Sequence, residues 1–474
     1  MYIKLLAFII IQAGFCRKCV NTVSVINKFN DECNLSAELI KEIESYKNIT
    51  QRILTEITTT DLGYKMYQRY TEFIDKFGAR VSGSDVLERA IDHMINLTSQ
   101  YGVTEVITED VEVPYWVRGD ETVTMIRPRR KNVAVLGLAP NVPTPAAGIT
   151  AEVLVVKSFE EFDSIPKNKV RGKIVLFDAH YISYGDTVIY RVQSATKAAE
   201  KGAVACLIRS ITPFSLYTPH TGSQHYDDKV PKIPCGAITL EDADLFRRLQ
   251  NSGETIVLNI KMFSTLDQRI SRNTIIDLKG SVHPNNVVIV SGHIDSWDVG
   301  QGAMDDGGGM MISWFVPVVL NVLKSKPRRT VRAILWTSKE PGLIGASAYL
   351  KRHINELDNI NLIMESDEGT FKPLGLDLAT SKSAQCIIAE ILKLFPSTNK
   401  TKISENVGSD IALFVDKGVP GASLLNENER YFWYHHSEAD TLNVQNKEDV
   451  INCAAFWAAF SYIVADLSVD IPRV

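Results

Sequence analysis

A chain of 474 residues, of which 45% are hydrophobic, can bury a large core and is too long for one ordinary domain. We therefore expect two domains, or one domain with a substantial insertion. The formal net charge is −5 and the basic residues form no long tract, so the composition does not favour binding to nucleic acid.

The first 16 residues have the composition of a secretory signal peptide. Lys4 precedes an apolar run at residues 5–11, and smaller residues follow around Ala13. The run is too short to span a bilayer, and no other stretch of the sequence reaches that length. We therefore expect residues 1–16 to be removed, leaving a secreted or lysosomal protein without a membrane span. A short buried N-terminal helix is the alternative, and the cleavage point is open.

Potential glycosylation sites agree with a secreted protein, because Asn-x-Ser/Thr is the acceptor pattern for N-linked sugars. The four candidates are Asn34, Asn48, Asn96 and Asn399. The seven cysteines are scattered, which argues against a thiolate zinc site and against a disulfide scaffold. Whether Cys19 and Cys33 pair is left open. Cys206 lies in an apolar run and is expected to be a buried free thiol.

The first part of the mature chain has helical periodicity at residues 34–101, broken by a loop at residues 77–84. Residues 103–113 then alternate apolar and acidic side chains, as an outer strand does. These segments are expected to open an α/β domain.

Residues 132–264 differ from the rest, because short β-rich runs are separated there by loops that contain proline and glycine. The expected strands are residues 133–138, 151–156, 173–177, 204–208 and 256–260, interrupted by one helix at residues 192–202. The stretch resembles a protease-associated domain, through VRGKIVLF (170–177), AAEKGA (198–203) and VPKIP (230–234). Such insertions usually frame a site without taking part in its chemistry.

Strands and helices alternate from residue 265 to the end. The expected strands are 273–278, 286–290, 330–336, 360–364 and 421–425, and the helices are 310–323, 345–354, 383–394 and 447–465. This alternation predicts an α/β fold with a twisted, mostly parallel sheet flanked by helices. Pro317 is expected to kink or shorten the first of these helices.

Side chains that bind metals follow several of these strands. They occur in GHID (292–295), in WTSKE (336–340), in MESD (364–367), in YHHSEADT (434–441) and in the pair Asp305 and Asp306. Open α/β sheets place their sites at the carboxyl ends of the strands. Carboxylates gathered there would repel one another and resist burial unless a cation neutralised them. A metal centre is therefore expected, although a lone histidine is more often a satisfied buried residue.

These motifs resemble those of the co-catalytic zinc aminopeptidase and carboxypeptidase family. The resemblance covers residues 64–472 and is carried by residues 291–309, LWT (335–337), MESD (364–367), GVPGASLL (418–425) and FWYHHS (432–437). It implies a zinc exopeptidase fold in two parts, residues 17–131 and 265–474, interrupted by the protease-associated-like insertion at residues 132–264.

The resemblance also implies two zinc ions and names five ligands. His293 and Asp367 match the ligands of one ion. Glu340 and His436 match those of the other, and Asp305 matches the bridging carboxylate. All five positions carry the residue type that the family has there.

The resemblance also bears on the choice of histidine and on residues around the ligands. His436 is preferred to His435 as the ligand because the family's histidine precedes Ser/Thr-x-x-Asp. Asp295 is expected to orient His293 from behind the metal, the usual task of a carboxylate beside a metal-binding histidine. Residues 408–410 are expected near the pocket, with a helix-capping loop as the alternative.

Lys339 breaks the pattern, because the family has a glutamate there that acts as general base. A protonated ammonium cannot accept a proton. In the first interpretation the site binds zinc but hydrolyses peptides poorly or not at all. In the second, the metal ions depress the pKa of Lys339 so that the amine serves as base. In the third, Glu368 supplies the missing carboxylate or pairs with Lys339.

The family pattern implies hydrolysis of short unblocked peptides, mainly dipeptides, by a hydroxide that bridges the zinc ions, and it implies a homodimer. The alternative is a catalytically inactive zinc-binding pseudopeptidase that captures peptides or a protein partner through the insertion. Substrate preference is left open.

Overall fold

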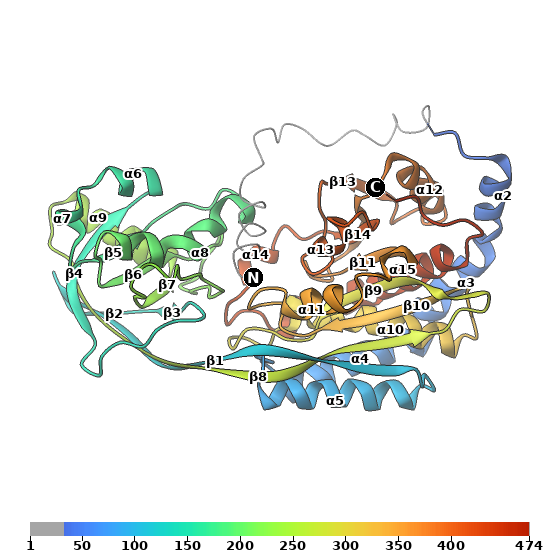
Figure 1. Cartoon of the computed structure of the whole chain (residues 1–474), viewed down its shortest axis with the longest axis horizontal. Coiled ribbons are helices and arrows are strands. Elements are labelled where there is room, and N and C mark those ends of the chain that lie inside the picture. The colour runs from blue at the N-terminus through green and yellow to red at the C-terminus, as the bar shows by residue number, and fades with distance from the viewer. Residues whose placement is uncertain (1–32, 474) are drawn as a thin grey trace.

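The structure, a computed structural model, describes residues 33–473 (Figure 1). The expected signal peptide and Cys19 lie outside these residues. Within them, no helix is both long enough and apolar enough to cross a membrane.

The described chain begins with four amphipathic helices. They are α2 (Ala37–Ser45), α3 (Lys47–Thr59), α4 (Asp61–Phe77) and α5 (Asp85–Gln100). Three of these helices have a hydroxyl residue as N-cap. The side chains of Ser36, Thr60 and Ser84 each accept a hydrogen bond from a backbone N–H in the first turn. The predicted helical stretch and the loop at residues 77–84 are thus confirmed.

The main sheet is built around three parallel strands, β9 (His283–His293), β10 (Arg329–Trp336) and β11 (Ile360–Glu365), with β9 in the middle. Four more strands extend it, namely β14 (Gly421–Asn426), β12 (Pro373–Ala379), β13 (Lys400–Ile403) and β8 (Val257–Leu278). β14 continues the parallel pairing with β11, whereas β8 runs antiparallel to β10. β12 runs antiparallel to β14 and parallel to β13. The predicted α/β fold with a mostly parallel sheet is confirmed.

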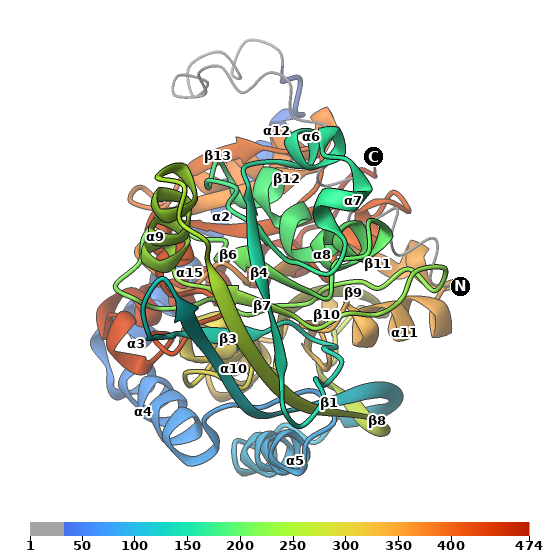
Figure 2. The same ribbon diagram turned by 90° about the vertical axis from the view of Figure 1, so that its left-hand side faces the viewer.

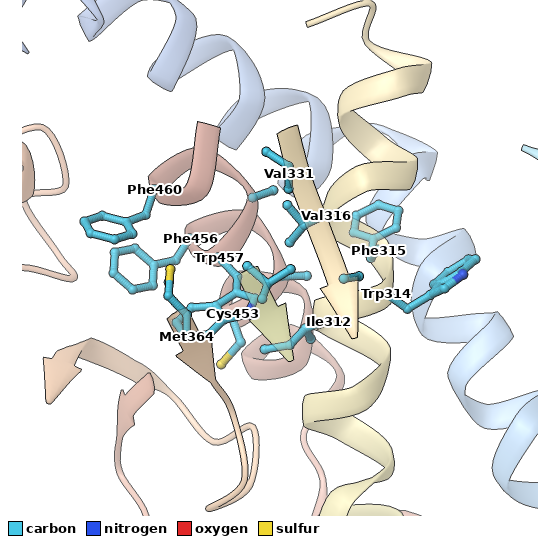
Figure 3. Packing of buried hydrophobic residues seen from close by; sticks show 14 of the residues in the cluster. Ile312, Trp314, Phe315, Val316, Val331, Met364, Cys453, Phe456, Trp457 and Phe460 are labelled. Atoms are coloured by element: carbon cyan, nitrogen blue, oxygen red, sulfur yellow. The ribbon is translucent and has the colours of Figure 1, made fainter. Parts of the chain in front are cut away.

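Helices cover both faces of this sheet. α10 (Gly308–Val322) and α15 (Lys447–Asp466) pack together on one face, where Trp314, Phe456 and Trp457 are buried in one apolar cluster (Figure 3). The other face is covered by α11 (Ile344–Arg352) and α13 (Ala412–Val415), and α12 (Lys382–Leu392) packs against α2. α10 passes through Pro317 and ends five residues later, so the proline does not shorten it.

Residues 131–256 form a separate lobe, joined to the main sheet by a long antiparallel ribbon of β1 (Val106–Arg127) and β8 (Figures 1 and 2). Its strands are β2 (Lys131–Val133), β3 (Val135–Gly137), β4 (Ile149–Val156), β5 (Ile174–Phe177), β6 (Ala205–Arg209) and β7 (Cys235–Ile238). Its helices are α6 (Phe159–Ser164), α7 (Lys167–Val170), α8 (Tyr184–Glu200) and α9 (Leu240–Asn251). Two apolar clusters give this lobe its own core. The single predicted helix corresponds to the second half of α8, and α9 was not predicted.

A disulfide joins Cys33 to Cys386, and so ties the beginning of the described chain to α12. Cys206 is a fully buried free thiol, as predicted. The asparagines of the four expected glycosylation patterns, Asn34, Asn48, Asn96 and Asn399, are all exposed.

Candidate metal centre

The candidate site lies where β9, β10 and β11 end side by side. The register pairs His293 with Trp336, and Ser291 with Glu365, so the three strands deliver the residues that follow them to one edge of the sheet. The turn after β10, the loop after β11 and the loop at residues 435–441 therefore meet the long loop that follows His293.

His293 lies between two carboxylates. Its Nε2 is 3.1 Å from Oδ1 of Asp305 and 3.0 Å from Oδ1 of Asp367. Its Nδ1 lies 2.9 Å from the backbone carbonyl oxygen of Asp295, which can only accept, so Nδ1 carries the hydrogen. In the neutral ring the lone pair of Nε2 therefore faces both carboxylate oxygens. A proton or a metal ion is needed to make that arrangement favourable.

His436 is arranged in the same way on the other side of Asp305. Its Nε2 is 3.3 Å from Oδ2 of Asp305 and 3.2 Å from Oε2 of Glu340, and its Nδ1 is 3.2 Å from the carbonyl oxygen of Thr221. The indole N–H of Trp297 also donates to Nε2, at 3.1 Å. Asp305 thus turns one oxygen toward each histidine, as a bridging carboxylate does.

The donor atoms fit a metal ion. Oδ2 of Asp305 and Oε1 of Glu340 are buried without a hydrogen-bond partner, which is costly unless a cation satisfies them. His293, Asp305 and Glu340 offer ligand atoms within 4.8 Å of one another, and so do Asp305, His435 and His436. Imidazole and carboxylate ligands of this kind suit zinc.

His435 lies closer to the centre than the sequence suggested. Its Nε2 is 3.5 Å from Oδ2 of Asp305, and its ring stacks on that of His436 with the centroids 3.5 Å apart. Burial and the neighbouring His436 hold the pKa of His435 well below its ordinary value, so the ring is neutral. Among the described contacts only His436 of the pair reaches Glu340, which accords with its expected role as the ligand.

Asp295 supports the site differently from the expectation. Its backbone oxygen orients His293, whereas its Oδ1 is 3.6 Å from Nδ1 of that ring. The two carboxylate oxygens instead accept the backbone N–H groups of Lys339 and Glu340, at 3.0 and 3.2 Å. Asp295 therefore joins the end of β9 to the turn after β10.

Lys339 points into the carboxylate cluster. Its Nζ lies 3.2 Å from Oδ1 of Asp367, 3.5 Å from Oδ1 of Asp305 and 3.8 Å from Oε2 of Glu340. Burial lowers the pKa of Lys339, but these carboxylates outweigh burial and raise the pKa well above its ordinary value. Glu368 does not belong to this cluster, because its side chain is exposed and accepts a hydrogen bond from Asn428.

Two glycines make room for Asp306, which the sequence singled out without a role. A Cβ on Gly292 would lie 2.6 Å from Oδ2 of Asp306, and one on Gly309 would lie 2.3 Å from Oδ1. The buried carboxylate accepts the backbone N–H of His293 at 3.0 Å and that of Gly309 at 3.1 Å. Asp306 therefore holds the end of β9 against the start of α10.

Residues 408–410 do reach the site. Ser409 Oγ donates to Oδ2 of Asp367 at 2.5 Å, and the backbone N–H groups of Ser409, Asp410 and Ile411 point at the carboxylate of Glu365. Burial and the charge of Asp367 raise the pKa of Glu365 to about 7. Neither carboxylate oxygen of Asp410 has a hydrogen-bond partner, and burial together with the charge of Glu365 raises the pKa of Asp410 well above its ordinary value, which favours the neutral carboxyl group.

Arg80 was missed in the sequence. Its fully buried guanidinium donates to four carbonyl oxygens, those of Gly78, Ile294, Gln301 and Gly302, at 2.6 to 2.9 Å. These bonds hold the two ends of the loop that carries Asp295. The only signal in the sequence was the position of Arg80 in the predicted loop at residues 77–84.

The lobe at residues 131–256 also touches the site, from the side of His435 and His436. His220 Nδ1 lies 2.5 Å from the carbonyl oxygen of His435, and the N–H of Thr221 donates to that of His436 at 2.9 Å. Ser223 Oγ donates to the carbonyl oxygen of Glu340, also at 2.9 Å. The lobe thus frames the candidate centre.

Comparison with known proteins decides the family. Carboxypeptidase Q from Xenopus laevis is 44% identical over 439 residues, which cover 92% of this chain and 93% of that protein. Human carboxypeptidase Q is 44% identical over 438 residues, with the same coverage. Residues 273–461 match the model of peptidase family M28. The chain belongs to peptidase family M28. The predicted resemblance is confirmed, and by family the protein is a zinc metallopeptidase.

Solved structures agree. The peptidase M28 precursor from Shewanella amazonensis SB2B is 29% identical, covers 91% of this chain and 99% of its own, and superposes with a TM-score of 0.86. The aminopeptidase from Aneurinibacillus sp. strain AM-1 shares the fold at 20% identity, covering 89% of this chain and 98% of its own, with a TM-score of 0.66.

Proposed function

We propose that the protein is a secreted or lysosomal zinc exopeptidase-type protein that takes short unblocked peptides and whose turnover is impaired by Lys339. The observation that carries this proposal is the meeting of His293, Asp305, Glu340, Asp367 and His436 at one sheet edge, with the ammonium of Lys339 among them. The ligands form two half-sites, each suited to one zinc ion. When bound, zinc would polarise the scissile carbonyl and acidify water.

The residues around the half-sites have separate tasks in this proposal. Asp305 turns one oxygen toward each half-site, and the carbonyl groups of Asp295 and Thr221 hold the two imidazoles by Nδ1. Nε2 of His293 is then free to bind metal, whereas Nε2 of His436 would exchange the indole N–H of Trp297 for a metal ion. The position of the family's general base is occupied by an ammonium that three carboxylates keep protonated. A missing general base typically costs a factor of about 100 to 10,000 in rate.

The compartment and assembly are part of the proposal. The exposed acceptor asparagines and the disulfide between Cys33 and Cys386 support an oxidising, secretory location. The inserted lobe would act as a protease-associated domain. The homodimer that the family resemblance implies can be tested by light scattering on the purified protein.

The proposal is tested by zinc analysis and dipeptide assays of the purified wild type and of Lys339→Glu. We expect the variant to hydrolyse dipeptides at least about 100-fold faster than the wild type. Lys351→Glu, which makes the same charge change at an exposed position on α11, is the control and should match the wild type. Strong wild-type turnover would contradict the impairment.

Absence of turnover in both proteins would favour a second candidate, a zinc-binding pseudopeptidase. The ammonium of Lys339 beside Asp367 supports this candidate, because an ammonium at that position is compatible with metal and peptide binding but not with base catalysis. Calorimetric titration of the wild type with dipeptides that showed no turnover tests the pseudopeptidase candidate. A pseudopeptidase should bind these dipeptides and release them unchanged.

A further inference from the structure

We infer that Lys339 is a built-in cation that takes the place of one of the two metal ions, so that this protein holds a single zinc ion, between Asp305, Glu340 and His436. The inference rests on the proposed zinc site and concerns how that site is occupied. The inference concerns Lys339, which stands where the family has a glutamate.

The position of the ammonium is the first argument. Its two nearest carboxylate oxygens, Oδ1 of Asp367 and Oδ1 of Asp305, are the same two atoms that Nε2 of His293 approaches at 3.0 and 3.1 Å. The positive charge of Lys339 therefore already lies on the oxygens of the His293–Asp367 half-site. Glu340, in the other half-site, is the most distant of its three partners.

Charge balance is the second argument. Asp305, Glu340 and Asp367 supply three negative charges, and the ammonium of Lys339 offsets one of them, so less metal charge is needed to neutralise these carboxylates. With a glutamate at position 339 the four carboxylates would sum to −4, which two zinc ions neutralise. Exchanging glutamate for lysine thus changes the charge of the site by the charge of one zinc ion. Two zinc ions beside the ammonium would leave a buried excess of positive charge.

Space is the third argument. A small cavity of about 10 Å³ lies beside Asp305, Glu340 and His436, and Trp297 and Asp440 also line it. A volume of that size holds about one water-sized sphere. The residues lining this cavity include neither His293 nor Asp367, so the cavity lies on the side of Asp305 that faces Glu340 and His436.

Lys339 cannot easily leave the cluster. Its backbone N–H is held by Asp295, and its carbonyl oxygen accepts the N–H groups of Gly342 and Leu343. The side chain is only 11% exposed, so the ammonium would have to break three carboxylate contacts to reach solvent. It is therefore a fixed part of the site.

The test is zinc content per chain, measured by plasma mass spectrometry after saturation with zinc and gel filtration. We expect about one ion in the wild type and in Lys339→Arg, which keeps the charge, and about two in Lys339→Glu. In the wild-type background, His436→Ala should lose the ion and His293→Ala should keep it. Circular dichroism and thermal melting establish that each variant is folded, and Lys351→Glu is again the control.

The outcomes separate this inference from the proposed function. About two ions in the wild type, or loss of the single ion in His293→Ala but not in His436→Ala, would overturn the inference and leave the zinc-site proposal intact. No zinc in either the wild type or Lys339→Glu would overturn both. No gain of zinc in a folded Lys339→Glu would overturn the inference alone.

Discussion

The Oδ1 of Asp295 accepts the backbone N–H of Lys339 at 3.0 Å, and this bond joins the end of β9 to the turn that follows β10. The other oxygen accepts the N–H of Glu340. The distance between the candidate ligands His293 and Glu340 thus depends on a carboxylate that need not bind metal itself.

Asp295→Asn should weaken zinc binding. An asparagine keeps one acceptor oxygen but places an amide N–H₂ where a backbone N–H already points, so one of the two bonds is replaced by a repulsive contact. Loss of such a supporting group typically weakens metal binding by about 10- to 100-fold. Competition with a chromophoric chelator measures the effect. Asp298→Asn, in the same loop but paired with Arg118, should bind zinc as the wild type does, and equal affinities for the two variants would contradict the role of Asp295.

Arg80→Met should cost about 3–5 kcal/mol of unfolding free energy, because it leaves buried carbonyl oxygens without donors. Arg80→Lys should recover only part of this loss, since an ammonium cannot reproduce the planar fork that reaches four carbonyl oxygens. Urea unfolding followed by fluorescence gives the values. Arg69→Met, which removes an exposed ion pair with Glu72, should change stability by less than about 0.5 kcal/mol.

Protonation of His220 should destabilise the contact between the lobe and the site in acid. Burial lowers the pKa of His220 to about 4, below the ordinary value of 6.5, so the unfolded chain binds the proton first as the pH falls. The stabilisation is therefore complete above pH 6.5 and is lost progressively as the pH falls toward 4. The loss amounts to about 3 kcal/mol from this group.

Urea unfolding at pH 7 and at pH 4.5 measures that loss in the wild type and in His220→Asn. The asparagine can still donate to the carbonyl oxygen of His435 but does not titrate, so the variant should lose less stability between the two pH values. His180→Asn is a matched control, because His180 is exposed, and should retain the pH dependence of the wild type. Identical pH dependence in all three proteins would exclude His220 as the titrating group.

The fold was largely predictable because the strands at its centre are buried on both faces. β9, β10 and β11 contain short apolar runs, Val287–Val290, Ala333–Trp336 and Leu362–Met364, and short runs of this kind are typical of strands buried on both faces. β13 was missed because Lys400–Ile403 is short and polar, and its pairing with β12 is what defines it. α9 was missed because it is mostly polar, although Thr239 and Asp242 form a recognisable helix start.

The candidate ligands were predictable because each follows a strand in a short motif, whereas their supports were not. Arg80 contacts residues more than 200 positions away, and Cys33 pairs with a cysteine 353 positions away, so no local pattern reports either contact. The sequence placed Lys339 beside Glu340. Which oxygens surround the ammonium depends on how three strand ends meet.

Removal of the Cys33–Cys386 disulfide should destabilise the protein by about 2–5 kcal/mol. The bond joins residues 353 positions apart, so its loss frees a very long loop in the unfolded chain. It also releases the segment before α2 from α12, against which α2 packs. Cys33→Ser and Cys386→Ser should have equal effects on urea unfolding, because each variant removes the same bond.

Reductant separates the disulfide from other effects of these substitutions. Dithiothreitol should lower the stability of the wild type to that of Cys33→Ser/Cys386→Ser and should leave the double variant unchanged. Cys206, Cys235 and Cys453 are buried free thiols, so they serve as an internal control that reductant does not alter. Wild-type stability that is insensitive to dithiothreitol, together with two additional reactive thiols in the unfolded protein, would show that the bond does not form. That result would also remove one of the supports for a secretory location.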